Sequence, residues 1–291
     1  MKLLAYLAIA ALALTQHTAV AQDPTNPSNA PNLGYYELLR LQKSFWTLFS
    51  YPNNVKEAES INSTIFAENV QGRVSDTRNF AGRELNTEYI FGLFIPSKSV
   101  SIIGQPGMGE IIQFTANQNI AAASTRVPFT FPQFGNKTLP VVIDTWIAWN
   151  DKGEIIQYDA TFKWFAHLVQ TLIFSLDSDH VAAGGKAVNA IVHSICTAHT
   201  QHCVGGNQQY ADEAECADFL KNRIRVGQPF EMGMDTLMCR SLHEHMIKFR
   251  PDVHCSHIGK TGGGMCDDHT SYSERVEENY FTNTPWIPTV I

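Results

Sequence analysis

Asp144 is the side chain whose place in the sequence points most directly to chemistry. It lies between Ile143 and Trp146, in an apolar run rich in β-branched and aromatic residues. A carboxylate is costly to bury unless it is paired or neutral. Two alternatives follow from this. Either the carboxylate faces solvent or bonds to a neighbouring loop, or it lies in a cavity as an acid or base with a raised pKa.

Histidines gather in the C-terminal part of the chain, at His193, His199, His202, His243, His245, His254, His257 and His269. Imidazole is the commonest metal ligand, and the His254-x-x-His257 spacing suggests a metal site. However, neighbours at i and i+2 on a helix do not face each other, so His243 and His245 would not form a ligand pair. No His-Glu-x-x-His or Cys-x-x-Cys motif occurs. We therefore predict no resident metal and no cofactor.

Hydrolase and phosphate-loop chemistry have no support in the sequence. No Gly-x-Ser-x-Gly elbow is present. The glycines at Gly262–Gly264 lack the strand and helix that a phosphate loop requires. A cysteine nucleophile is excluded if all the cysteines are bridged.

The element that must position Asp144 is a hairpin over Pro140–Phe165. Val141–Trp149 favours a half-buried strand, Asn150–Gly153 has turn chemistry, and Ile155–Phe165 resumes as a second strand. Side chains alternate faces along a strand. One face of the first strand carries Val142, Asp144, Trp146 and Ala148, and an almost wholly apolar face of the second carries Ile156, Tyr158, Ala160, Phe162 and Trp164.

The rest of the N-terminal part predicts helices followed by strands. Apolar residues at helical spacing indicate helices over Tyr35–Phe49 and Val55–Phe66. The remaining predicted segments are a short strand at Val70–Val74, a helix or mixed segment at Gly82–Phe94, strands at Glu110–Thr115 and Ile120–Phe131, and a helix at Leu168–Leu176. This order predicts an α+β fold with one curved antiparallel sheet packed on helices.

Two stretches resemble the NTF2-like superfamily, in its SnoaL-like branch. The phrase D-x-W-x-x-x-N-D-x-G-x-I, from Asp144 to Ile155, is similar to the last hairpin of such domains, and Arg73–Phe80 is similar to their early strand and loop. The resemblance covers roughly Gly34–His167 and implies a conical pocket inside the curved sheet.

By this resemblance, Asp76, Asp144, Tyr158 and His167 are candidate acid–base residues of the pocket. Tyr89, Trp146, Phe162 and Trp164 are candidates for its walls. The superfamily includes isomerases, cyclases, dehydratases and non-enzymatic binding modules, so the resemblance narrows the shape more than the chemistry.

All six cysteines lie in the C-terminal part, at Cys196, Cys203, Cys216, Cys239, Cys255 and Cys266. An even count in a secreted chain predicts three disulfides. Short separations suggest local pairs, Cys196 with Cys203 and Cys255 with Cys266. The stretch Cys239–Cys266 also resembles a group of secreted proteins of filamentous fungi.

The C-terminal part is predicted to be mainly helical. Helices are expected at Val188–His199, Asp212–Arg223 and Phe230–Phe249, after a linker at Ala182–Gly185. We therefore expect an NTF2-like domain over residues 34–180 and a Cys- and His-rich helical domain over residues 181–291.

The N-terminus predicts a secreted protein. Residues 1–21 have the charged, apolar and small-residue regions of a signal peptide, and residues 22–33 read as a disordered leader. Asn62 and Asn136 are glycosylation acceptors that fit this route. No later stretch has the length of a membrane span. The net charge of −7 argues against nucleic acid as a partner.

These observations favour a secreted protein with a pocket for a small apolar molecule. One hypothesis is an isomerase, cyclase or dehydratase that works by acid–base catalysis. The first alternative is a non-catalytic ligand-binding or interaction module, and the second is a histidine-rich metal binder. A homodimer is also possible.

Overall fold

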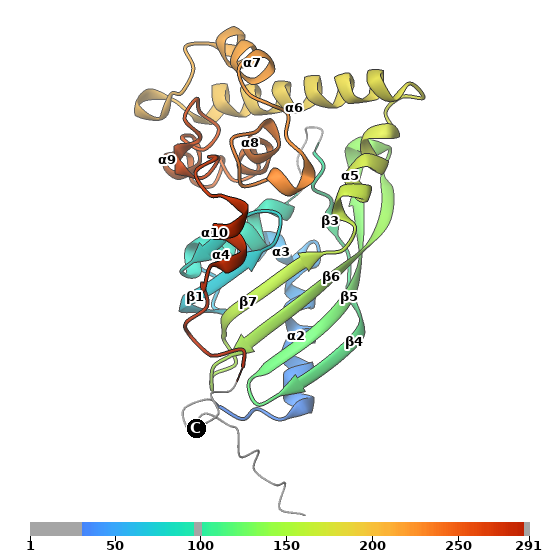
Figure 1. Ribbon diagram of the computed structural model, residues 1–291, viewed down its shortest axis with the longest axis vertical. Helices are drawn as coiled ribbons and strands as arrows, with labels where there is room; N and C mark the ends of the chain where they lie inside the picture. The colour runs from blue at the N-terminus through green and yellow to red at the C-terminus, as the bar shows by residue number, and fades with distance from the viewer. Residues whose placement is uncertain (1–30, 96–100, 288–291) are drawn as a thin grey trace, which may run out of the picture.

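A computed structural model of the protein describes residues 31–95 and 101–287. The predicted signal peptide and most of the predicted leader lie outside the described residues. The described part has a mixed α+β fold, in which a strongly curled sheet adjoins a mainly helical C-terminal region (Figure 1). This confirms the predicted fold class. Within the described residues, none of the helices is long and apolar enough to cross a membrane.

The sheet has the strand order β2-β1-β7-β6-β5-β3, and β4 also pairs with β5. Its strands are β1 (Phe66–Val74), β2 (Asn79–Ala81), β3 (Gln105–Pro106), β4 (Glu110–Asn117), β5 (Ile120–Phe131), β6 (Lys137–Trp149) and β7 (Ile155–Phe162). Every pairing is antiparallel except that of β1 with β7, which is parallel. Because of this parallel pair, the turn after β1 lies beside the end of β7, and Ser75 N donates to Ala160 O at 3.1 Å.

The predicted hairpin is confirmed as β6 and β7, at the centre of the sheet. Its turn is held by Asn150, whose Oδ1 accepts from the backbone N–H groups of Lys152 and Glu154. Gly153 takes a φ of +78° in this turn, which a residue with a Cβ adopts only with strain.

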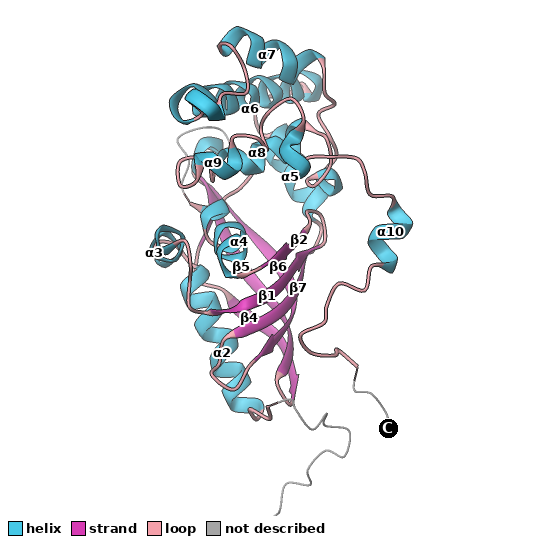
Figure 2. Cartoon of the chain, turned by 90° about the vertical axis from the view of Figure 1, so that its left-hand side faces the viewer, coloured by secondary structure: helices cyan, strands magenta, loops and turns pink. Residues whose placement is uncertain are grey.

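The helices of the N-terminal part lie against one face of the sheet (Figure 2). They are α2 (Tyr35–Phe49), α3 (Asn53–Ser60), α4 (Arg83–Ile90) and the 3₁₀ turn η1 (Gly92–Phe94). The apolar stripe of α2 is buried, as predicted. The predicted second helix is too long, because Ile61 takes the left-handed conformation at the end of α3 and Phe66 already begins β1.

The C-terminal region is mainly helical. Its helices are α5 (Phe165–Phe174), α6 (His180–His202), α7 (Glu213–Asn222), α8 (Leu237–Glu244), α9 (Pro251–His254) and α10 (Tyr272–Glu277). Short 3₁₀ turns occur in this region at Gly205–Asn207, Pro229–Glu231 and Gly262–Gly264, and a further one, Pro132–Phe134, lies between β5 and β6 of the sheet.

Two predictions for this region are wrong, one of a linker and one of the length of a helix. The segment Ala182–Gly185 is part of α6 and not a linker, because Asp179 caps the helix by accepting from Val181 N and Ala182 N. The predicted helix at Phe230–Phe249 is shorter, because the Thr236 side chain accepts from Cys239 N and sets the helix start at Leu237.

Three disulfides join Cys196 to Cys216, Cys203 to Cys255 and Cys239 to Cys266. The number is as predicted, but both local pairings are wrong. Cys196 and Cys203 lie at one end of α6, and seven residues of helix separate their Cα atoms by about 10 Å. That separation exceeds the about 4.4–6.8 Å that a disulfide spans.

The C-terminal segment returns to the sheet and runs along the face opposite to α2 (Figure 2). Gln157 of β7 is fully buried there, because its side chain exchanges hydrogen bonds with the backbone of Thr284. Tyr280 donates its hydroxyl to Phe80 O at 2.8 Å. The last described residues of the chain therefore cover the part of the outer face that β1 and β7 form.

Candidate functional site

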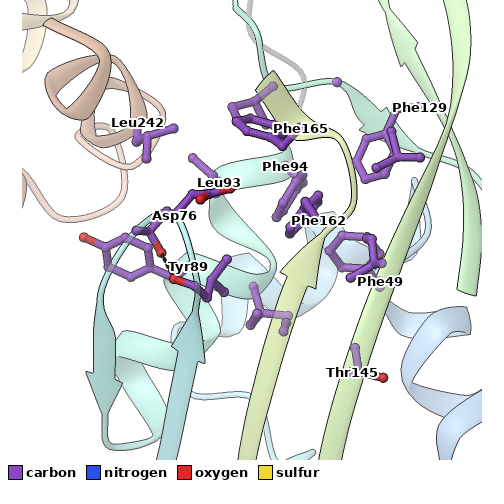
Figure 3. A pocket seen from close by; sticks show the side chains of 18 of the residues that line it. Phe49, Asp76, Tyr89, Leu93, Phe94, Phe129, Thr145, Phe162, Phe165 and Leu242 are labelled. Carbon is purple, nitrogen blue, oxygen red and sulfur yellow. Dashed lines mark hydrogen bonds between the residues drawn. The ribbon is translucent and has the colours of Figure 1, made fainter. Parts of the chain in front are cut away.

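A cavity lies between the inner face of the sheet, α2, η1 and α5 (Figure 3). About 90 Å³ of it is open to the centres of water-sized spheres, several times the ~10–15 Å³ that one water requires. Aromatic rings dominate the lining: Phe45, Trp46, Phe49, Phe80, Tyr89, Phe94, Phe129, Phe131, Tyr158, Phe162 and Phe165. A cavity with so few polar groups favours an apolar ligand over water.

Helix α2 supplies one wall of the cavity. Phe45, Trp46 and Phe49 project from its buried stripe, and Phe49 packs edge-on against Phe94 with ring centroids 4.9 Å apart. The helical spacing of these residues predicted that they face inward. It did not predict that they border empty space.

Asp76 provides the carboxyl group among the residues that line the cavity. It lies in the turn between β1 and β2, next to the end of β7. Burial raises the pKa of this half-buried carboxyl, because a charged carboxylate loses hydration there. Among the described residues it has no hydrogen-bond or ion-pair partner. The arrangement can therefore supply one acid or base to a bound molecule.

The two predicted tyrosines also line the cavity. The ring tip of Tyr158 is packed against β1 at Gly72, where an added Cβ would lie 2.3 Å from the tyrosine hydroxyl. Burial raises the pKa of Tyr158 and of Tyr89 well above the usual range, so both stay neutral. Tyr89 reaches out of the cavity, since its hydroxyl lies 3.4 Å from Nδ1 of His243.

Asp144 lies on the outer face of the sheet and not in the cavity. Its carboxylate accepts from Ser124 Oγ at 2.5 Å and pairs with Lys163 Nζ at 2.9 Å. The solvent-facing alternative is therefore the one that the structure bears out. The reason is the register of β6: Ile143, Thr145 and Ile147 are the residues that point inward.

Three further sequence candidates differ in their placement from the predicted pocket. Trp146 shares the outer face with Asp144 and is 52% exposed, against Trp286 of the C-terminal segment. Trp164 is 74% exposed, because β7 ends at Phe162 and Trp164 precedes α5 in a left-handed conformation. His167 is exposed on α5. Of the wall candidates, Tyr89 and Phe162 line the cavity.

The C-terminal region also contributes to the lining, a role that the sequence analysis did not predict. Met232 and Leu242 line the cavity from the far side, and both are buried. They pack in the same hydrophobic core as α2 and the sheet. The cavity is therefore enclosed by both parts of the chain, and the apolar spacing of Leu242 on α8 indicated only that it faces inward.

Comparisons with known proteins place the chain in a family. Residues 43–160 match the model of the BfoA N-terminal domain, and residues 157–269 match the BfoA family C-terminal domain. The chain belongs to the BfoA family. The family's two models meet at the end of β7, while the boundary near residue 180 stays a prediction of the sequence.

Relatives in the BfoA family are named after fungal biosynthesis clusters. The chain is 47% identical to the bifonsecin B biosynthesis cluster protein A of Aspergillus brasiliensis, over 89% of each chain. It is also 47% identical to the aurasperone B biosynthesis cluster protein A of Aspergillus niger, over 89% of this chain and 86% of the relative. These names connect the BfoA family with secondary-metabolite pathways.

Proposed function

We propose that this protein binds a small apolar intermediate of a fungal secondary-metabolite pathway in its aromatic cavity. The observation that carries the proposal is a cavity lined by residues of both BfoA domains, with an almost wholly apolar surface. The names of the relatives support the pathway class. The curled sheet with helices on its inner face is compatible with the NTF2-like resemblance, whose members hold ligands at this place.

The proposed chemistry is acid–base catalysis by Asp76, in an isomerisation, cyclisation or dehydration. A carboxyl with a raised pKa can take a proton from one atom of the ligand and return it to another, which these reactions require. The indole N–H of Trp46 is buried and has no partner among the described residues, so a ligand oxygen would satisfy it. Asp76 thus takes the role that the sequence assigned to Asp144.

We further propose that the protein acts in the secretory pathway or outside the cell. Three disulfides support this compartment, because thiols stay reduced in the cytosol. The two predicted glycosylation acceptors, Asn62 and Asn136, are exposed. A decrease in mass on treatment of the secreted protein with an N-glycosidase would support modification at these positions, and an unchanged mass would contradict it.

The test of the cavity is recovery of its ligand. Protein purified from the secretion of its fungal host is analysed by native, non-reducing mass spectrometry, and the bound molecule is extracted and returned to the apoprotein. We expect an apolar organic mass that competes with a hydrophobic fluorescent dye. Dye binding that a bulky Thr145→Trp change leaves unaltered would contradict binding in the cavity.

Catalysis is separated from binding by a matched pair of variants. Asp76→Asn should abolish turnover of the extracted molecule and leave it bound, whereas Asp144→Asn, on the outer face, should leave turnover intact. The alternative is a non-catalytic carrier. It is favoured because no base or nucleophile within residues 31–95 and 101–287 forms a hydrogen bond with Asp76. Recovery of the ligand unchanged after long incubation with the wild-type protein would decide for the carrier.

A further inference from the structure

Three buried histidines meet outside the cavity, where the C-terminal region packs on α4. His243 projects from α8, His254 ends α9, and His257 follows in the next turn. Their exposed fractions are 2%, 0% and 8%. Each offers one ring nitrogen, and these three nitrogens lie within 4.8 Å of one another.

Their separations suit a shared metal ion. Zinc binds histidine nitrogen at about 2.0–2.1 Å, so two nitrogens of a tetrahedral site lie about 3.4 Å apart. Nδ1 of His243 and Nδ1 of His257 are already 3.2 Å apart. The ring of His254 is centred 5.8 Å and 5.2 Å from the other two, and its ligand nitrogen lies within 4.8 Å of theirs.

His254 carries the strongest sign of a missing ligand. Its Nε2 lies 3.2 Å from the carboxylate of Glu88, which fixes the ring proton on that nitrogen. Nδ1 is then the atom with the lone pair, and it is buried without a hydrogen-bond partner among the described residues. A carboxylate that holds the far nitrogen of a histidine is the usual support of a metal ligand. Arg250 in turn holds Glu88, with Nη1 3.1 Å from Oε1.

We propose that His243, His254 and His257 bind one divalent transition-metal ion, with Zn²⁺ the best match, and that Glu88 orients His254. Imidazole nitrogens suit zinc, copper, nickel and iron better than calcium or magnesium. Three protein ligands leave one position of a tetrahedral ion open to water, which is the pattern of catalytic zinc.

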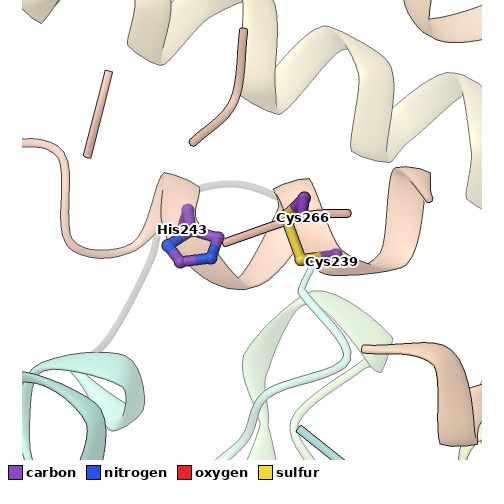
Figure 4. A group of neighbouring side chains, drawn as sticks. All are labelled: Cys239, His243 and Cys266. Atoms are coloured by element: carbon purple, nitrogen blue, oxygen red, sulfur yellow. A yellow bond between two sulfur atoms is a disulfide. The ribbon is translucent and has the colours of Figure 1, made fainter. Parts of the chain in front are cut away.

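The neighbouring sulfurs do not belong to this site. Cys239 and Cys266 lie beside His243 (Figure 4), but they form a disulfide and offer no thiolate. The ligands therefore come from histidine alone. With Glu88 on α4 and the ligands on α8, on α9 and in the turn after α9, the ion would join the N-terminal part to the C-terminal region.

The experiment uses the full secreted protein, purified without reductant and stripped with a chelator. It is loaded with ZnCl₂, dialysed and analysed for metal, and Co²⁺ is then used as an optical probe of nitrogen coordination. We expect a single Zn²⁺ per chain and a visible cobalt band. His257→Gln should lose both, and the buried neighbour His245→Gln, which contacts Ser101, should retain both.

Glu88→Gln keeps every ligand, so it tests the site even if a ligand variant fails to fold. Loss of the support should weaken Zn²⁺ binding roughly 10–100-fold. Three outcomes would overturn the proposal: no metal retained by the wild type, equal retention by His257→Gln, or uptake only after reduction. The last outcome would assign the metal to Cys239 and Cys266. None of these results depends on whether the cavity binds a ligand.

Discussion

The hydroxyl of Tyr89 lies 3.4 Å from both ring nitrogens of His243, while the ring of the same tyrosine lines the cavity. Tyr89 also stacks on Phe80, with ring centroids 4.0 Å apart. The cavity and the histidine cluster thus share a wall. Because Tyr89 belongs to α4 and His243 to α8, this wall also connects the two domains of the BfoA family.

Two substitutions separate the roles of Tyr89. Tyr89→Phe keeps the stack on Phe80 and removes one long hydroxyl contact, so the free energy of unfolding should fall by about 1 kcal/mol or less. Tyr89→Ala leaves a cavity in the shared wall, so it should lower the free energy of unfolding by about 3–5 kcal/mol. Guanidinium unfolding of both variants checks this. An equal decrease in the free energy of unfolding for both variants would show that the hydroxyl of Tyr89, and not its ring, stabilises this contact.

Asp76→Asn should stabilise the protein at neutral pH. Burial raises the pKa of Asp76 in the folded state, so the folded protein holds this proton at a pH where the unfolded chain has lost it. Wild-type stability relative to the variant therefore falls as the pH rises from about 4 through the folded pKa. Tm measured from pH 3.5 to 7 should show a difference that grows with pH. Asp144→Asn, which loses an exposed ion pair, should change stability by at most about 1 kcal/mol.

Gly72→Ala should be severely destabilising. The new Cβ would lie 2.2 Å from Asn86 Oδ1 and 2.3 Å from the Tyr158 hydroxyl, and both neighbours are buried. We expect a loss of about 3 kcal/mol or more. The matched control is Gly184→Ala, inside α6, where no atom lies within 4 Å of the added Cβ. Because alanine favours a helix more than glycine does, this change should raise the free energy of unfolding by about 0.5–1 kcal/mol. Thermal unfolding of the two variants should shift Tm in opposite directions.

His199 should make stability depend on pH. Its Nε2 accepts from the backbone N–H groups of Gln209 and Tyr210, at 3.0 and 3.3 Å, and burial lowers its pKa. Below about pH 6.5, His199 is therefore protonated in the unfolded chain but stays neutral in the folded protein, so the free energy of unfolding decreases as the pH falls. His199→Gln should flatten the Tm profile between pH 7 and 5. The control is His193→Gln, at an exposed position, which should leave the dependence of Tm on pH as it is in the wild type. Part of this dependence should remain in every variant, because the pKa values of the buried His243, His245 and His257 are also lowered.

The disulfides should differ in their contribution to stability. Cys203–Cys255 closes 52 residues and Cys196–Cys216 closes 20. The chain-entropy argument gives about 4 kcal/mol for the longer loop and about 3 kcal/mol for the shorter. Unfolding of the two double Cys→Ser variants in guanidinium measures both losses. A larger loss for the shorter loop would mean that packing around Cys216, and not loop entropy, dominates.

The hairpin and the curved sheet could be predicted because they depend on local signals. Turn residues at Asn150–Gly153 and alternating apolar residues in both strands determine β6 and β7 without reference to distant segments. The face of Asp144 could not be assigned in this way, since both faces of β6 carry apolar residues. Which face points inward is decided by α2, where Gln42 donates to Thr145 at 3.2 Å.

The histidine cluster and the disulfide pairs lie beyond sequence reasoning for a related reason. His243 and His257 are 14 residues apart in the sequence, and only the packing of α8 against α9 brings their nitrogens together. Local spacing indicated His254 with His257, which the cluster contains, but it offered no reason to add His243. It also paired Cys196 with Cys203, which the geometry of a helix keeps apart. Leu242 and Met232 reach the cavity through the same long-range packing.

The hydrogen bonds of Gln157 to Thr284 have a consequence for biosynthesis of the chain. Gln157 and Thr284 are 127 residues apart in the sequence, so β7 is synthesised well before the segment that covers it. The outer face of β1 and β7 is thus completed late in synthesis, after the helical region that lies between them and Thr284 in the sequence. Removal of residues 280–287 would therefore uncover β7 and destabilise the N-terminal part, although these residues lie far from it in the sequence.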